Sequence, residues 1–133
     1  AAILIAATAD PAANAEIAAQ AVPTGAKWRL RSFQIQLVQG ATQTPRPALR
    51  IRDDAGTVLW EGPAAAQQSA STTVDYSWAR GVGRDLSDTN GLAQSMPLPD
   101  LVMLSGYDFI TVTAGLGSNS NYGVGTYQYE EWF

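Results

Sequence analysis

Cysteine and histidine are both missing from this chain of 133 residues. The absence of cysteine excludes disulfide bonds, thiolate metal sites and a cysteine nucleophile. The absence of histidine removes the most frequent general base and the most frequent ligand of transition metals. The side chains that remain for chemistry are carboxylates, cations, tyrosines and hydroxyls. The composition therefore argues against an enzyme, and we expect neither a metal ion nor another cofactor.

Positive charge is scarce and unevenly distributed along the chain. The net charge is −4, which opposes general binding to nucleic acid. Residues 1–52 carry six cations and two acids (+4), whereas residues 53–133 carry two cations and ten acids (−8). Separate basic and acidic surfaces would let identical copies dock head to tail. Alternatively, the two halves interleave in space and the asymmetry disappears.

Long apolar runs are missing as well. Residues 1–7 are apolar, but a bilayer needs about 20 such residues. No cation precedes Lys27, so this start also lacks the basic region of a signal peptide. We therefore expect no association with a membrane.

Short segments that alternate between apolar and polar residues dominate the chain from Lys27 onward. In the first of them, the apolar face switches between Leu30 and Phe33, which predicts a β-bulge or a bend near Ser32. Residues 54–56 end in a glycine, which supplies the positive φ that hairpin turns need. The sequence therefore predicts a hairpin at this point.

The spacing of these segments predicts the fold class. Segments predicted as strands are 2–8, 16–22, 28–37, 48–53, 57–60, 72–78, 95–104, 107–113 and 122–132. This pattern indicates an all-β, single-domain antiparallel β-sandwich of about eight strands. A jelly roll is favoured over an immunoglobulin-like sandwich, which would rely on a Cys–Trp–Cys core. Residues 1–26 would form an extended N-terminal arm and the first strand region, and residues 27–133 the sandwich core.

Residues 81–94 form a predicted loop that is longer than most connections, and such loops often contact partners. Its Asp85, Ser87, Asp88 and Asn90 offer oxygen atoms of the kind that bind calcium. Their spacing differs from that of an EF-hand, however, and turn residues commonly satisfy one another. We expect a solvated loop tip without calcium.

Aromatic residues and paired acids raise the question of sugar chemistry. The adjacent acids 53–54 and 130–131 would point to opposite faces of a strand, so neither pair forms a two-carboxylate glycosidase site. The aromatic residues would either stack on a glycan or fill the sandwich core, and the core is the favoured interpretation. They are Trp28, Trp60, Trp78, Trp132, Tyr76, Tyr107, Tyr127 and Tyr129.

The apolar N-terminal segment, with Ile3, Leu4 and Ile5 at its centre, would be an exposed edge if it were left free. It could pair with its own domain, or it could add a strand to a neighbouring subunit. The sequence leaves both alternatives open.

Five stretches of the chain carry a family resemblance. They are ATADPAANAE (7–16), WRL (28–30), IRDDAG (51–56), LPDL through SGY (98–107) and EEW (130–132). With these strand and turn residues, the chain resembles small structural proteins of tailed bacteriophages, such as capsid decoration (cement) proteins. The resemblance implies a jelly roll on the outer surface of the virion head that binds the major capsid protein and reinforces the shell. It also implies a homo-oligomer, with a trimer favoured.

The residues expected at inter-subunit or capsid contacts come from three parts of the chain. These are the N-terminal segment, the rigid loop 45–47 and the loop 81–94, with Ile3, Leu4, Ile5, Arg46, Arg84, Asp85 and Asp88 as the candidates. Two alternatives remain open. One is a phage tail or fibre component that binds a host glycan, and the other is a free-standing carbohydrate-binding module.

Overall fold

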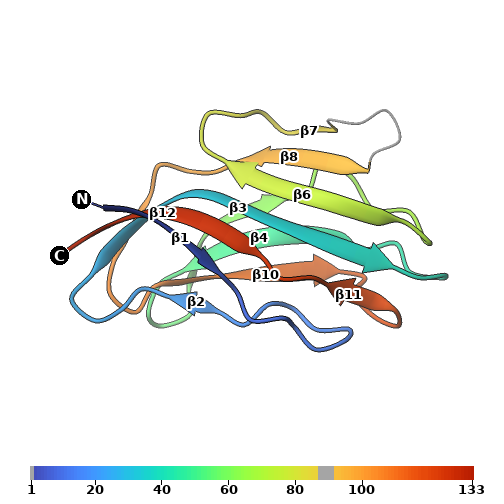
Figure 1. The fold of residues 1–133 in the computed structure, drawn as a ribbon, viewed down its shortest axis with the longest axis horizontal. Helices are drawn as coiled ribbons and strands as arrows, with labels where there is room; N and C mark the ends of the chain where they lie inside the picture. Colours follow the sequence, from blue (N-terminus) through green and yellow to red (C-terminus); the bar gives the residue numbers. More distant parts are fainter. Residues whose placement is uncertain (1, 87–91) are drawn as a thin grey trace.

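The computed structural model describes residues 2–86 and 92–133, which form strands, turns and loops but no helix (Figure 1). The strands are β1 (Ala2–Ala7), β2 (Gln20–Ala21), β3 (Lys27–Gln39), β4 (Arg46–Arg52), β5 (Val58–Pro63), β6 (Thr73–Ala79), β7 (Asp85–Leu86), β8 (Ala93–Pro97), β9 (Val102–Met103), β10 (Asp108–Ala114), β11 (Ser120–Tyr122) and β12 (Thr126–Trp132).

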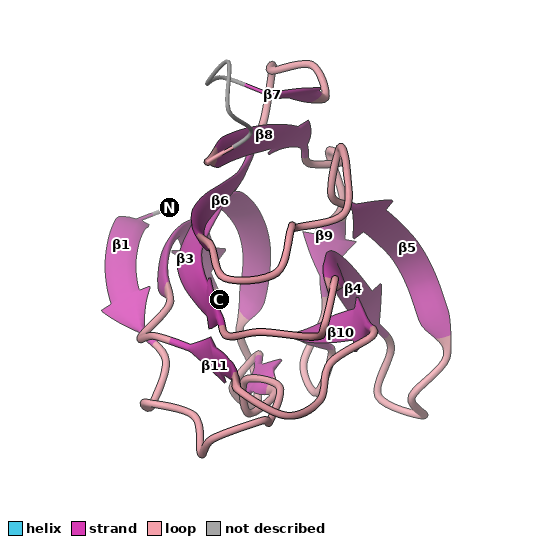
Figure 2. Ribbon diagram, turned by 90° about the vertical axis from the view of Figure 1, so that its right-hand side faces the viewer, coloured by secondary structure: helices cyan, strands magenta, loops and turns pink. Residues whose placement is uncertain are grey.

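These strands form two sheets that pack face to face. The large sheet has the order β1-β12-β3-β6-β8-β7, and β9 and β11 also pair with β3. The small sheet has the order β2-β10-β4-β5. All neighbours run antiparallel except β6 and β8, which are parallel. Seen end on, β1 and β5 lie on opposite sides of the molecule (Figure 2). The expectation of an all-β sandwich is confirmed.

Aromatic side chains join the two sheets in the core. Phe33 of β3 meets Phe109 of β10 edge to face, with ring centroids 5.6 Å apart. Trp78 of β6 is fully buried, and its indole N–H donates to the carbonyl of Gly62 in β5 at 2.9 Å. Such geometry follows from the period of two, which turns alternate side chains of each strand inward.

The predicted bulge and hairpin are both present. Gln128 of β12 faces Ser32 of β3, but the next residue, Tyr129, faces Leu30, so Arg31 is the additional residue of a bulge. Strands β4 and β5 pair as a hairpin, and Gly56 between them has φ of 85°. The bulge matters for the site below, because it places two half-buried residues, Arg31 and Ser32, between the buried Leu30 and Phe33.

The predicted strand 16–22 is shorter in the structure, where only β2 pairs with β10. The residues before it are held by side-chain bonds instead. The Glu16 carboxylate accepts from the backbone N–H and the hydroxyl of Thr113, each at 2.7 Å. The N–H of Ile17 donates to the hydroxyl of Thr111 at 3.2 Å. Because the N–H groups of Ile17 and Thr113 already bond to side chains, residues 16–19 form no backbone ladder with β10.

Of the two alternatives for the N-terminal segment, the structure shows pairing within its own domain. Strand β1 runs antiparallel to β12, from Ala2 opposite Glu131 to Ala7 opposite Thr126. Residues 1–26 thus contribute β1 to the large sheet and β2 to the small one.

Candidate functional site

Strand β1 forms one edge of the large sheet and exposes apolar side chains there. Ile3 and Ile5 share the outer face with Glu130 and Gln128, opposite which they lie in the ladder. Their side chains are 56% and 76% exposed, and Leu4 is 37% exposed. Within residues 2–86 and 92–133, β12 is the only strand that pairs with β1. An exposed, apolar edge of this kind is a template for pairing with another chain.

Contacts at its C-terminal end fix β1 against the domain. The buried Thr8 donates its N–H to the carbonyl of Gly125 at 2.8 Å. In return, the N–H of Gly125 donates to the Thr8 hydroxyl at 2.9 Å. Ala6 packs against the core from the inner face of the strand. These contacts set the register of β1, so its exposed side chains belong to an ordered strand.

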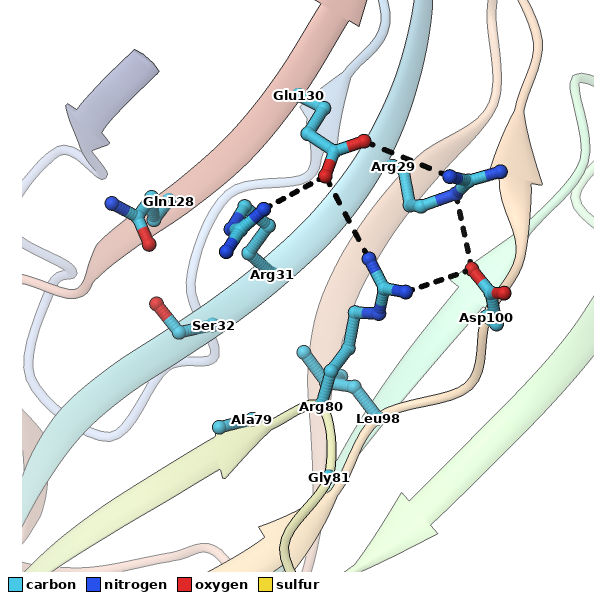
Figure 3. Close-up of a pocket in the computed structure, with 10 residues that line it drawn as sticks. All are labelled: Arg29, Arg31, Ser32, Ala79, Arg80, Gly81, Leu98, Asp100, Gln128 and Glu130. Atoms are coloured by element: carbon cyan, nitrogen blue, oxygen red, sulfur yellow. Dashed lines mark hydrogen bonds and ion pairs between the residues drawn. The ribbon is translucent and has the colours of Figure 1, made fainter. Parts of the chain in front are cut away.

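A cluster of five charged residues lies on the large sheet and in the segment after β8. We call Arg29, Arg31, Arg80, Asp100 and Glu130 the arginine cluster (Figure 3). Glu130 contacts all three guanidinium groups, at 2.8 Å from Arg31, 3.7 Å from Arg29 and 3.8 Å from Arg80. Asp100 contacts Arg29 at 3.0 Å and Arg80 at 3.3 Å.

The arginine cluster borders an open hollow of about 750 Å³. Each of its arginines already faces a carboxylate, and three cations against two acids leave a formal charge of +1. Glu130 is 19% exposed and Asp100 is 65% exposed, so water screens much of the attraction. The ion pairs therefore link β3, β12 and the residue after β6 to the segment after β8. This arrangement suits a structural role better than the binding of an anionic ligand.

Sequence reasoning missed the arginine cluster. Arg31 and Glu130 are separated by 99 positions in the chain, and only the folded sheet brings them together. The available signal was the bulge near Ser32, which places Arg31 where it reaches β12. Without the order of the strands, the bulge does not indicate that Glu130 is the partner of Arg31.

The described residues contain no group of three or more Asp or Glu side chains that could hold a metal ion. Burial raises the pKa of Tyr76 and Tyr122 above the ordinary value near 10. Burial also raises the pKa of Tyr127 and Tyr129. Such phenols stay neutral at physiological pH, which suits packing rather than proton transfer. The described part of the chain holds no helix that could span a bilayer.

Three of the remaining predicted contact residues lie on elements that do not pair with β1. Arg46 is in β4 of the small sheet, where its guanidinium donates to the carbonyl of Ala64 at 2.8 and 3.0 Å. Arg84 is exposed, and Asp85 begins β7 at the opposite edge of the large sheet. Asp88 lies outside the described residues, as do Ser87 and Asn90 of the loop that is expected to be solvated and without calcium. The structure therefore brings together Ile3, Leu4 and Ile5 but places Arg46, Arg84 and Asp85 on other elements.

The aromatic residues serve mainly the core. The buried ones are Trp28, Trp78, Tyr76, Tyr122, Tyr127, Tyr129, Phe33 and Phe109. Trp60, Trp132 and Tyr107 are half-buried. The favoured interpretation of these side chains as core is thus confirmed for most of them, and a stacking platform for sugars would have few members.

The uneven charge along the sequence does not become two separate surfaces. Cations of the first 52 residues pair with acids of the remainder, as in Arg50 with Glu61 and Arg52 with Asp108. The last pair is bidentate, at 2.9 and 2.8 Å, and it raises the pKa of Arg52. The two halves of the chain interleave in space, so a head-to-tail attraction of opposite faces loses its basis.

Comparisons with models of protein families, with curated proteins and with solved structures found no match. What supports a function is therefore the chain's own sequence and geometry. Among the predicted contact residues, Ile3, Leu4 and Ile5 of β1 combine apolar side chains with exposure on an ordered edge strand.

Proposed function

We propose that this chain is a structural protein of a tailed-bacteriophage particle, of the capsid decoration (cement) type. In this role it binds the major capsid protein on the outer surface of the assembled head and works without enzymatic activity. The observation that carries the proposal is the edge strand β1, with Ile3 and Ile5 exposed on an ordered strand. Sheet edges of this kind bind other chains through main-chain hydrogen bonds and side-chain pockets.

Two features of the fold belong to the same proposal. The sandwich would be a jelly roll, although β6 and β8 run parallel and most jelly-roll neighbours are antiparallel. Strand β1 would act as the arm that contacts a neighbouring subunit or the shell. Reinforcement of the shell would then come from the summed burial of many small interfaces, at about 25 cal/mol per Å² before entropic costs.

The buried phenols and paired arginines support a structural role. Each arginine of the arginine cluster faces a carboxylate, and the raised pKa values of the core tyrosines keep them neutral. Such groups hold a fold together without offering a free acid, base or nucleophile. A decoration protein needs only a stable body and a contact surface.

Co-sedimentation with heads tests the proposal. Purified protein is added to heads that were assembled without it, and the pellet is assayed for bound protein. We expect saturable binding, and we expect Ile5→Lys to weaken it at least tenfold, because the head would cover Ile5, which is 76% exposed in the free chain, and a lysine charge is costly to bury there. Leu104→Lys is the matched control, since Leu104 is also exposed, at 43%, but lies outside β1.

Two outcomes would contradict this proposal. One is that the wild-type protein stays in the supernatant at all head concentrations. The other is that it pellets with tails or fibres instead, which would assign it to a different part of the particle. Equal loss of binding in Ile5→Lys and Leu104→Lys would remove β1 as the contact.

A further inference from the structure

We infer that β1 pairs with β1 of a second copy of this chain, antiparallel and about a two-fold axis that passes through Ile5. The two large sheets would then join into one continuous sheet. This inference goes beyond the proposed function: both assign a partner to the β1 edge, and here that partner is a second copy of this chain in solution. It rests on the backbone, register and side chains of β1.

The backbone of β1 has its free hydrogen-bonding groups on odd-numbered residues. Thr8 directs its N–H toward the carbonyl of Gly125, the residue that precedes β12. The ladder from Ala2 to Ala7 is unbroken, and successive residues of an antiparallel strand direct their N–H and C=O to opposite sides. Ile3, Ile5 and Ala7 therefore direct both groups away from β12, toward the open edge.

One register satisfies all of these groups at once. If Ile5 faces Ile5 of the second copy, then Ile3 faces Ala7 and Ala7 faces Ile3. Each of these three pairs exchanges two backbone hydrogen bonds, because odd-numbered residues meet odd-numbered residues. A shift by one residue would oppose odd-numbered to even-numbered positions, and the outward groups would then lack partners.

The side chains of β1 match this register. On the outer face, the large Ile3 lies opposite the small Ala7, and Ile5 meets its own copy at the axis. On the inner face, Leu4 would lie opposite Ala6. No residue from Ala2 to Ala7 is charged, so the pairing brings no like charges into direct opposition. The apolar groups that are exposed in one copy are thus covered by the other.

A second copy fits this edge better than other partners do. The strand is uncharged and is complementary to itself in backbone direction and in side-chain size, which is the requirement of a two-fold interface. A trimeric ring would instead require β1 to pair with a different surface of the next copy. At the other end of the large sheet, β7 begins with Asp85 and has a charged neighbour in Arg84, and charged residues protect sheet edges from pairing.

The lack of cysteine in this chain makes a sharp test possible. In the inferred register, the Cα atoms of Ile5 and its copy lie about 5.5 Å apart, within the roughly 4.4–6.8 Å that a disulfide spans. The Cα atoms of Ile3 and its copy are displaced by four residues, or about 14 Å along the strand. Single-cysteine variants of the full chain therefore map the pairing.

We expect Ile5→Cys to form a covalent dimer under mild oxidation, as seen by mass spectrometry and non-reducing electrophoresis. Ile3→Cys alone is the matched control, because it lies on the same strand and face, and it should form no covalent dimer, because the two Ile3 positions are too far apart for a disulfide. A mixture of Ile3→Cys with Ala7→Cys should give the mixed dimer. The wild-type protein should sediment as a dimer, with twice the mass of the 14.1 kDa chain. The Ile5→Lys variant should sediment as a monomer.

Several results would overturn the inference. They are equal cross-linking of Ile5→Cys and Ile3→Cys, a wild-type protein that stays monomeric as its concentration rises, and a trimer as the smallest oligomer. Binding of a monomeric protein to heads would leave the proposed function standing while it refutes the β1 pair. A dimer that does not bind heads would do the reverse.

Discussion

The buried glutamine Gln68 provides the most quantitative prediction on stability. It lies in the connection between β5 and β6, is 1% exposed and faces the core. Its side-chain amide donates to the carbonyls of Leu37 and Thr72, each at 2.9 Å. Its side-chain carbonyl accepts from the hydroxyl of Tyr76, also at 2.9 Å and also buried. The amide therefore closes the connection over β3 and β6.

Substitution Gln68→Leu keeps the approximate volume and removes every one of these bonds. The Thr72 carbonyl retains a second donor, the N–H of Gln39, whereas the Tyr76 hydroxyl loses the only partner it has among the described residues. A buried hydroxyl without a partner costs about 1–3 kcal/mol, and the lost hydrogen bond to the Leu37 carbonyl costs about 1 kcal/mol more. The expected loss of unfolding free energy is therefore about 2–4 kcal/mol.

A double-mutant cycle with Tyr76→Phe isolates the pair. Tyr76→Phe alone leaves the Gln68 carbonyl without a donor, whereas the double variant removes both groups. We expect the double variant to lose about 1–3 kcal/mol less than the sum of the two single variants. With an unfolding entropy of about 2.1 cal/mol/K per residue, each kcal/mol corresponds to about 4 °C in this chain.

Urea unfolding, monitored by tryptophan fluorescence, measures these differences for a two-state domain. Gln67→Leu is the matched control, because Gln67 is the exposed neighbour in the same connection, and its change should stay within about 0.5 kcal/mol. Additive effects of Gln68→Leu and Tyr76→Phe would refute the reasoning. So would a Gln68→Leu variant that is as stable as the wild type.

Two further predictions concern packing and pH. Gly125→Ala should destabilise the fold by about 1–3 kcal/mol in urea unfolding, because the added Cβ would lie 2.8 Å from the fully buried Phe33 ring. The control Gly123→Ala, whose added Cβ has no atom closer than 4.0 Å, should be neutral or slightly stabilising. Equal effects of the two substitutions would contradict this expectation. The stabilisation that comes from the buried tyrosines should be fully present below about pH 10 and fall above it, because the unfolded chain loses phenolic protons first. Absorbance of phenolate should therefore rise together with alkaline unfolding. Titration of these four phenols near pH 10 in the folded protein would contradict the raised pKa of Tyr76, Tyr122, Tyr127 and Tyr129.

Local patterns in the sequence were sufficient to predict several elements. Alternation identified most of the longer strands, the glycine at position 56 identified the β4–β5 hairpin, and the change of face near Ser32 identified the bulge. Each of these signals depends on neighbouring residues and on the period of two. The sequence also supported the aromatic core, since alternation places large side chains on one face.

Features that depend on distant pairing were beyond the reach of these patterns. Gln68 looks like an ordinary polar residue of a connection, and only its contact with Tyr76 and β3 explains its burial. Arg31 and Glu130 meet because β3 lies beside β12, which no local signal specifies. In the same way, the pairing of β1 with β12 decides that Ile3 and Ile5 face outward.

The location of the protein in a purified particle tests the central claim most directly. Electron cryo-microscopy of the virion should show the sandwich on the outer surface of the head, with the β1 edge, including Ile5, covered by another protein chain. A map that places the sandwich in the tail would contradict the account. A map that shows the sandwich on the head with β1 facing solvent would contradict the role assigned to this edge.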